Sequence, residues 1–149
     1  MNSTCGLRGG FYISIHLLAI DPGRQKCGLA VVNEKAQVLI KEVIPVERLK
    51  EKVAALDEEF GLKKIIVGDR TNSSYIRQCL VSFNKPIITV NEDKSTLEGR
   101  YRYLRENTKG FARFIPIGLR MPREPFDDYV AVILAERFLK NAPTLVKED

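Results

Sequence analysis

The apolar residues change their spacing partway along the chain, and this change limits the possible folds more than any other feature. Residues 12–44 contain three runs in which apolar residues alternate or are continuous, a pattern typical of β-strands. From Val46 to Phe60 the apolar residues recur at spacings of three and four, which predicts an amphipathic helix. The chain therefore combines strands with helices that cover them.

The expected strands and helices follow one another in a simple order. Strands are expected at about Tyr12–Ile20, Cys27–Asn33, Gln37–Ile44, Lys64–Gly68 and Pro86–Val90, and helices at about 46–60, 75–83, 95–107 and 126–140. The first three strands should form an antiparallel meander, because residues 33–36 are short enough for a hairpin turn. Strand–helix–strand alternation over residues 40–90 implies parallel strands beneath helices. The predicted fold class is α/β, a mixed five-stranded sheet flanked by helices.

Two helix starts carry capping signals, and one connection is unusually long. Ser95 and Glu98 have the spacing of a capping box, in which the serine side chain caps the helix. Residues 71–74 offer several N-cap candidates for the helix expected at about 75–83. Residues 108–125 hold glycines and prolines, which predict a long irregular connection before the last helix.

The length and composition fit one ordinary domain. With 149 residues, we expect a single domain over residues 1–149, in which 1–12 are an N-terminal extension and 141–149 a polar tail. Hydrophobic residues make up 44% and charged residues 29%, which is usual for a globular chain. Because no apolar run approaches the roughly 20 residues that span a bilayer, no membrane partner is expected.

The cysteines and the single histidine argue against several kinds of site. Three scattered cysteines without a Cys-x-x-Cys pair disfavour a zinc site and a disulfide framework, and they indicate a reducing compartment, the cytoplasm. His16 lies within an apolar run, so it is interpreted as a histidine packed in or beside a strand. A mechanism that needs a histidine base therefore has little support.

Acidic residues follow two of the expected strands. Asp21 comes after an apolar strand, and Glu92 follows another in the same way. If these strands are parallel neighbours, both side chains project at one edge of the sheet, where sites of α/β proteins lie. The alternative is that Asp-Pro-Gly at 21–23 is an ordinary turn and Glu92 a solvated loop residue. The repeated arrangement favours a site.

A pair of aspartates, Asp127 and Asp128, opens the last helix. One aspartate before a helix is explained by capping, but the second is then free to face the site. Several carboxylates at one edge repel one another unless a divalent cation lies between them. Oxygen ligands suit Mg²⁺ or Mn²⁺, and two such ions support hydrolysis of a phosphodiester.

Positive charge is concentrated in one segment of a chain whose net charge is +5. Between residues 94 and 123 eight cations stand against two acids, a distribution typical of nucleic-acid binding. The cations are Lys94, Arg100, Arg102, Arg105, Lys109, Arg113, Arg120 and Arg123. The interleaved aromatic residues could stack on unpaired bases or could be buried beneath a solvated helix face.

Three segments resemble motifs of a known family. Residues 20–30, Ile-Asp-Pro-Gly-Arg-Gln-Lys-Cys-Gly-Leu-Ala, resemble the first-strand motif of RuvC-type and YqgF-type (RuvX) resolvases. Residues 90–96 are similar to the Asp-Glu-Arg-x-Ser-Thr signature of YqgF proteins, and residues 127–139 resemble their terminal helix. The resemblance covers about residues 16–140 and implies a ribonuclease H-like fold with Mg²⁺ or Mn²⁺. It also implies Holliday-junction resolution or maturation of pre-16S ribosomal RNA.

Carried over by position, the resemblance makes Asp21, Glu92 and one of Asp127 and Asp128 the metal ligands. The YqgF helix pattern aligns Asp127 to the catalytic aspartate, whereas the Asp-x-x-Ala spacing of RuvC favours Asp128. Residues 68–71 are Gly-Asp-Arg-Thr where the family has Gly-Leu-Pro, so the acid at position 69 is either part of the site or a loop residue.

Three functions follow from these observations. The leading hypothesis is a metal-dependent endonuclease for structured nucleic acid, a four-way DNA junction or precursor rRNA. Asn91 replaces the family's aspartate and Asp93 its arginine, so the alternative is a catalytically weak or inactive nucleic-acid-binding module of the same fold. An actin-like ATPase would need two lobes where this chain has one. Symmetric junction cutting requires a homodimer, for which the apolar segment near Phe11 is a candidate surface.

Overall fold

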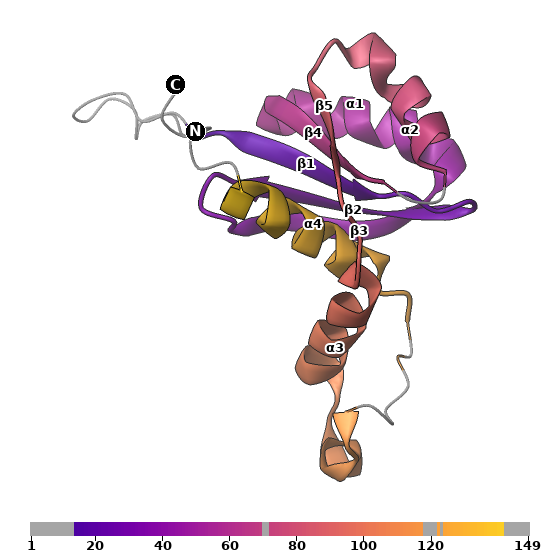
Figure 1. Cartoon of the computed structure of the whole chain (residues 1–149), viewed down its shortest axis with the longest axis vertical. Helices are drawn as coiled ribbons and strands as arrows, with labels where there is room; N and C mark the ends of the chain where they lie inside the picture. The colour runs from indigo at the N-terminus through magenta and orange to yellow at the C-terminus, as the bar shows by residue number, and fades with distance from the viewer. Residues whose placement is uncertain (1–13, 70–71, 118–121, 123, 142–149) are drawn as a thin grey trace, which may run out of the picture.

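The computed structural model describes residues 14–69, 72–117, 122 and 124–141 (Figure 1). The expected N-terminal extension, the tail beyond 141 and the first residues of the expected first strand lie outside this range. The strands are β1 (His16–Asp21), β2 (Lys26–Asn33), β3 (Val38–Pro45), β4 (Leu62–Gly68) and β5 (Ile87–Val90). The helices are α1 (Leu49–Phe60), α2 (Ser73–Leu80), α3 (Ser95–Asn107) and α4 (Asp127–Asn141), with short 3-10 turns at Val46–Arg48, Val81–Phe83 and Gly110–Phe114.

The five strands form one mixed sheet in the order β3-β2-β1-β4-β5. The first three are antiparallel, whereas β4 pairs parallel to β1 and β5 parallel to β4. The predicted mixed sheet with an antiparallel start is therefore confirmed. The predicted adjacency of the strands before Asp21 and Glu92 is wrong, because each crossover helix adds its strand beside the last one and places β4 between them.

Helices cover both faces of the sheet, with α1 and α2 on one side and α4 on the other (Figure 1). Along β2, Leu29 and Val31 belong to the core beneath α1 and α2, while Ala30 and Val32 face α4, as the alternation of side chains along a strand requires. The α4 face combines larger residues such as Leu17 and Ile66 with small side chains on both partners: Ala19, Ala30, Ala131 and Ala135. The small residues let the helix axis lie close to the sheet.

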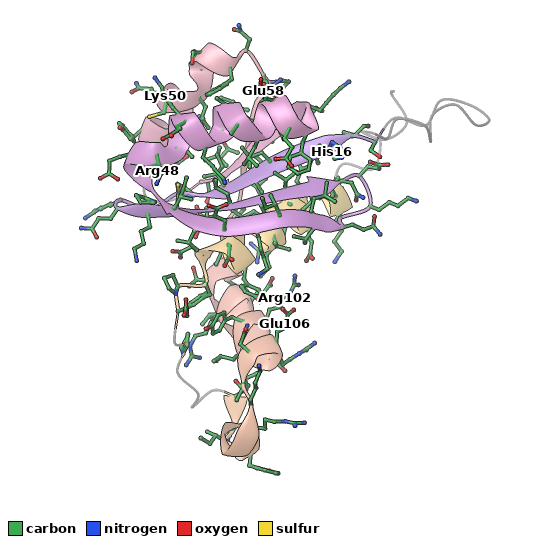
Figure 2. The ribbon with its side chains drawn as sticks, turned by 180° about the vertical axis from the view of Figure 1, so that it is seen from behind. His16, Arg48, Lys50, Glu58, Arg102 and Glu106 are labelled. Carbon is green, nitrogen blue, oxygen red and sulfur yellow. The ribbon has the colours of Figure 1, made fainter. Side chains whose placement is uncertain are left out.

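His16 and the cysteines have structural environments. The His16 Nδ1 lies 2.7 Å from the carbonyl oxygen of Phe60, and the two rings meet edge to face at 5.5 Å (Figure 2). The interpretation of His16 as a packed strand residue is confirmed. Cys27 is buried and Cys79 half-buried, and both are free thiols. No helix in the described ranges is long and apolar enough to cross a membrane.

Helix α3 leaves the sheet and packs against α4 (Figure 1). The contact depends on Gly99, where a Cβ would lie only 2.7 Å from Val130 Cγ2. Tyr103 meets the Tyr129 ring edge to face at 5.6 Å farther along the same interface. The outer end of α3 projects away from the sheet (Figure 1).

The predicted capping box at Ser95 is wrong, whereas the N-cap position of α2, Asn72, lies within the expected 71–74 segment. Helix α3 is entered through Lys94 at φ +63°, and α2 through Asn72 at φ +65°, with no side-chain cap in either. A left-handed residue turns the chain abruptly, which makes Ser95 the first helical residue instead of the cap. Its hydroxyl is buried without a hydrogen-bond partner. The Asn72 amide instead donates to the carbonyl of Gly23 at 2.7 Å.

We expect Ser95→Ala to raise the free energy of unfolding by about 1 kcal/mol. The change replaces a buried, unsatisfied hydroxyl with a methyl group and improves helix propensity. Urea denaturation would measure the effect. The exposed Ser74 in α2 is the matched control, and Ser74→Ala should stay within about 0.5 kcal/mol. A destabilised Ser95→Ala protein would show that the hydroxyl has a stabilising partner.

Candidate functional site

Asp21 is the last residue of β1, the central strand of the sheet, and it pairs with Gly28 of β2. Burial, followed by the charges of Glu92 and Asp127 and a hydrogen bond with Glu92, raises the pKa of Asp21 to about 8. Three of the four predicted carboxyl groups therefore act on one another at the carboxyl end of the sheet.

Glu92 reaches this cluster across the end of β4. The residue is only 5% exposed, although it lies in a loop after β5. Its side chain covers Gly68, where a Cβ would overlap the Glu92 carboxyl group. Because Gly68 has no side chain, the Glu92 carboxyl group can reach Asp21 across the end of β4, although β5 does not lie next to β1.

The structure distinguishes the two aspartates at the start of α4. Asp127 acts on the pKa of Asp21, and its own pKa is raised by burial and by Asp128, against the opposing charge of Lys26. Asp128 turns toward β3, where its carboxylate lies 3.7 Å from Lys41 Nζ and accepts a 2.9 Å hydrogen bond from its neighbouring backbone N–H. Asp127 therefore belongs to the cluster, and Asp128 borders it.

A glycine also controls the approach of α4. A Cβ at Gly28 would overlap the carbonyl oxygen of Asp127 and come within 2.7 Å of the Asp128 nitrogen. The first turn of α4 therefore lies directly on the backbone of β2. This contact holds the Asp127 backbone beside the strand end that carries Asp21.

The chemistry of this donor set fits a hard divalent cation, because the ligand atoms are carboxylate oxygens and the negative charges of Glu92 and Asp127 both raise the pKa of Asp21. Within the described ranges no three His, Cys, Asp or Glu side chains stand in the close arrangement of a bound ion. Asp21 and Glu92 instead share a hydrogen bond. Binding a cation therefore requires that Asp21 release its proton.

This proton makes stability and metal binding depend on pH. In the unfolded chain Asp21 ionises near its ordinary value of 3.8, but in the folded protein its pKa is about 8. The folded state therefore holds the extra proton between these values, and stability without metal should fall as pH rises from 4 to 8.

Because Mg²⁺ or Mn²⁺ competes with that proton, the Tm increase on adding metal should be larger at pH 8 than at pH 6. Thermal unfolding in EDTA and in each metal would measure both trends; an equal increase at the two pH values would contradict them.

The predicted cations are distributed unevenly over α3 and the segment after it. Arg102 donates to both carboxylate oxygens of Glu136 at 3.0 and 3.1 Å, so it holds α3 to α4. Arg105 lies over the Tyr101 ring, 5.5 Å from its centre. Lys94, Lys109 and Arg113 are exposed and Arg100 half-buried, whereas Arg120 and Arg123 lie outside the described residues.

The aromatic residues of α3 face in opposite directions. Tyr101 is 47% exposed and, with the 66% exposed Leu97, lines a shallow depression between Lys94 and Arg105. Tyr103 instead packs inward against α4. The interpretation as buried aromatics thus holds for Tyr103, whereas Tyr101 is exposed on the outward face of α3, which combines apolar and cationic groups.

Two charged residues near the cluster, Lys26 and Arg137, were missed in the sequence, whereas the role of Asp69 was left open. Lys26 opposes the raised pKa of Asp127, and its place directly after the Asp-Pro-Gly turn could have marked it. Asp69 accepts the backbone N–H of Glu92 at 3.1 Å. Arg137 donates to the carbonyl of Asn91 at 2.9 Å, and no local sequence signal indicates this contact.

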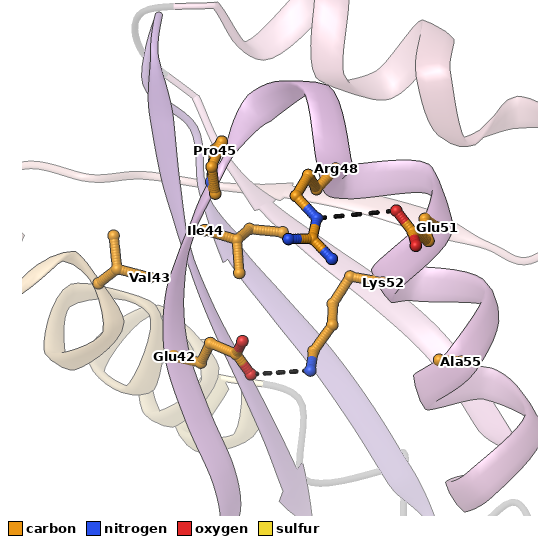
Figure 3. Close-up of a pocket in the computed structure, with 8 residues that line it drawn as sticks. All are labelled: Glu42, Val43, Ile44, Pro45, Arg48, Glu51, Lys52 and Ala55. Atoms are coloured by element: carbon orange, nitrogen blue, oxygen red, sulfur yellow. Dashed lines mark ion pairs between the residues drawn. The ribbon is translucent and has the colours of Figure 1, made fainter.

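A separate hollow lies between β3 and α1 and contains none of the predicted site residues (Figure 3). Lys52 Nζ pairs with Glu42 at 2.9 Å, and the Arg48 guanidinium lies 3.7 Å from Glu51. Because these charges are paired within its wall, the hollow offers few groups that converge on a ligand.

Comparison with known proteins assigns the fold. No family model and no curated protein sequence matches the chain. RuvC of Thermus thermophilus in complex with a Holliday junction substrate matches with a TM-score of 0.55 and 18% identity, over 89% of this chain and 96% of that one. The large terminase nuclease of thermophilic phage G20c with bound zinc matches with a TM-score of 0.54 and 13% identity, over 83% and 81% of the two chains. The chain has a ribonuclease H-like fold, as RuvC and the terminase nuclease do.

Proposed function

We propose that this protein is a metal-dependent nuclease that hydrolyses phosphodiester bonds in structured nucleic acid. The observation that carries the proposal is that the half-buried Asp21 and Asp127 and the buried Glu92 come together at the carboxyl end of the sheet. These side chains would hold Mg²⁺ or Mn²⁺, with Asp128 at the border. Two ions at such a site supply an activated water and stabilise the leaving oxygen.

The residues around the cluster suit a polyanionic substrate. Lys26 lies close enough to affect the pKa of Asp127, and the exposed cations Lys94 and Arg105 flank the outward face of α3. Cations at these positions would hold phosphates on either side of a scissile bond. Tyr101 offers an exposed ring for an unpaired base, as structured substrates provide.

The finer assignment is to the YqgF family, in which the substrate is a four-way DNA junction or precursor ribosomal RNA. The ordered motifs of the sequence support this assignment, and the RuvC of similar fold is bound to a Holliday junction. A junction substrate would require a homodimer, because two symmetric cuts need two sites. We place the protein in the cytoplasm, in keeping with its unpaired cysteines.

Cleavage of labelled four-way junctions and of a pre-16S RNA fragment tests the proposal. Each substrate would be incubated with Mg²⁺, Mn²⁺ or EDTA, beside the Asp21→Asn variant. Cutting that needs metal and Asp21 would support the nuclease and identify its substrate. Comparing Asp127→Asn with Asp128→Asn then tests the ligand assignment, since the first should lose more activity.

A non-catalytic binding module of the same fold is the second candidate. One observation favours it: the Asn91 side chain, at the position of a family aspartate, accepts the backbone N–H of Asp93 at 2.6 Å. That side chain is thus engaged within its own loop. Tight substrate binding without any metal-dependent cutting would select this function.

A further inference from the structure

The peptide bond that precedes Glu92 is held at both of its polar atoms. Its carbonyl, contributed by Asn91, accepts a 2.9 Å hydrogen bond from Arg137 Nη1. Its N–H, contributed by Glu92, donates to Asp69 Oδ1 at 3.1 Å. Arg137 and Asp69 thus each bind one polar atom of the same peptide unit.

Each of the two side chains is itself well placed for this contact. Arg137 belongs to α4, and its other nitrogen, Nη2, donates to Glu98 Oε2 at 3.2 Å, so the contact with the peptide and the contact with Glu98 use different nitrogens. Its side chain is only 24% exposed. Asp69 directly follows Gly68, the residue that the Glu92 side chain covers. The Asp69 contact with the Glu92 backbone therefore lies beside Gly68, the residue against which the Glu92 carboxyl group packs.

Strand pairing ends before it reaches Glu92. Among the described residues, strand β5 has four residues, lies at the edge of the sheet and pairs with β4, while the Glu92 carbonyl oxygen accepts the Ser95 N–H at 2.8 Å. Glu92 lies two residues beyond its end, in a loop that must still place a carboxylate within roughly 0.5 Å for ligation. Hydrogen bonds to charged groups are about twice as strong as neutral ones, so two of them can fix such a peptide.

We propose that Asp69 and Arg137 form a peptide clamp, two positioning residues that hold the Asn91–Glu92 peptide and thereby aim Glu92 at Asp21. This inference rests on the proposed function, because it concerns a ligand of the proposed metal site. Neither residue touches the metal or the substrate in this role. Helix α4 carries both Asp127, a member of the carboxylate cluster, and Arg137, a member of the clamp.

Mn²⁺ affinity of the folded protein, measured from the signal of free Mn²⁺ in electron paramagnetic resonance, is the primary test. We expect Asp69→Ala and Arg137→Leu each to weaken Mn²⁺ binding about ten-fold, as loss of a partner to a metal ligand does. Asp69→Asn keeps an acceptor oxygen and should recover most of the affinity. Glu98→Ala is the matched control, because it removes the other partner of Arg137 but leaves the peptide contact. Unchanged affinity in Asp69→Ala would overturn the clamp.

The double variant tests whether both residues act on one peptide. Independent effects would multiply to about a hundred-fold loss, since free energies of independent sites add. If the clamp is correct, Asp69→Ala with Arg137→Leu should weaken binding little more than either change alone. A multiplicative loss would overturn the shared mechanism.

Hydrogen exchange of the Glu92 amide separates this proposal from the nuclease itself. In metal-free protein we expect this amide to exchange at least about ten-fold faster in Asp69→Ala, with β1 and β4 still protected. If wild-type protein shows no Asp21-dependent Mn²⁺ binding, the proposed function fails. The exchange result then decides the clamp alone: faster exchange supports it, and unchanged exchange overturns it.

Discussion

Asp21→Asn should abolish metal-dependent cleavage and, without divalent ions, make the protein more stable. The substitution keeps the shape of the side chain but removes a carboxylate whose pKa is raised to about 8 by burial and by Glu92 and Asp127. Losing a partner of a metal ligand already costs 10–100-fold, so loss of the ligand itself should reduce cleavage by more than about a hundred-fold. Cleavage rates in Mn²⁺ and urea denaturation in EDTA measure the two effects.

The gain in stability has a defined pH range. Unfolded wild-type protein gives up the Asp21 proton near 3.8 and folded protein near 8, so the stability difference between variant and wild type should grow across this interval. At pH 8 we expect on the order of 2 kcal/mol, the scale of a hydrogen bond to a charged group. The exposed Glu51 on α1 provides the control, since Glu51→Gln should change neither quantity. A destabilised Asp21→Asn protein would mean that the carboxyl group is not under repulsion.

Gly28→Ala should have the largest effect on the folded structure. The new Cβ would overlap the backbone of Asp127 and Asp128, which cannot rotate aside as a side chain could. The start of α4 must then move away from β2, and we expect a loss of about 3 kcal/mol, at the upper end for overpacking. Asp127 would move with it, so Mn²⁺ affinity should fall as well. Urea denaturation and Mn²⁺ titration measure both losses.

Gly99→Ala is the matched control for this prediction. Its Cβ meets the side chain of Val130 at 2.7 Å, at the α3–α4 contact and away from the strand ends. It should lower stability less, because a side chain can adjust, and it should leave Mn²⁺ affinity unchanged. Equal losses of affinity in both variants would show that packing of α4 in general, and not its contact with β2, positions Asp127.

The spacing of apolar residues predicted the helices and strands well because burial on a sheet imposes it directly. The antiparallel start, the crossover helices and the last helix all appear within a few residues of their expected bounds. Capping failed as a guide because an entry residue with positive φ, such as Lys94, needs no capping side chain. A capping side chain contributes only about 1 kcal/mol, which is less than the packing that buries Ser95.

The carboxylates could be nominated from the sequence, but their arrangement could not. Asp127 and Asp128 are chemically alike, and only the rotation of α4 on β2 turns the first toward Asp21. The sequence could not show that Glu92 lies over Gly68, because this contact depends on β4 lying between β1 and β5. Arg102 looked like a free cation because its partner, Glu136, is distant in sequence.

The close seating of α4 on the sheet makes its length an evolutionary constraint. Asp127 and Arg137 are ten residues apart, about 15 Å along the helix axis. Inserting or deleting one residue between them would turn one end by about 100° relative to the other. Such a change would separate the acid at the first turn from the arginine that grips the Asn91 carbonyl. The number of residues between Asp127 and Arg137 is therefore constrained as tightly as the two residues themselves.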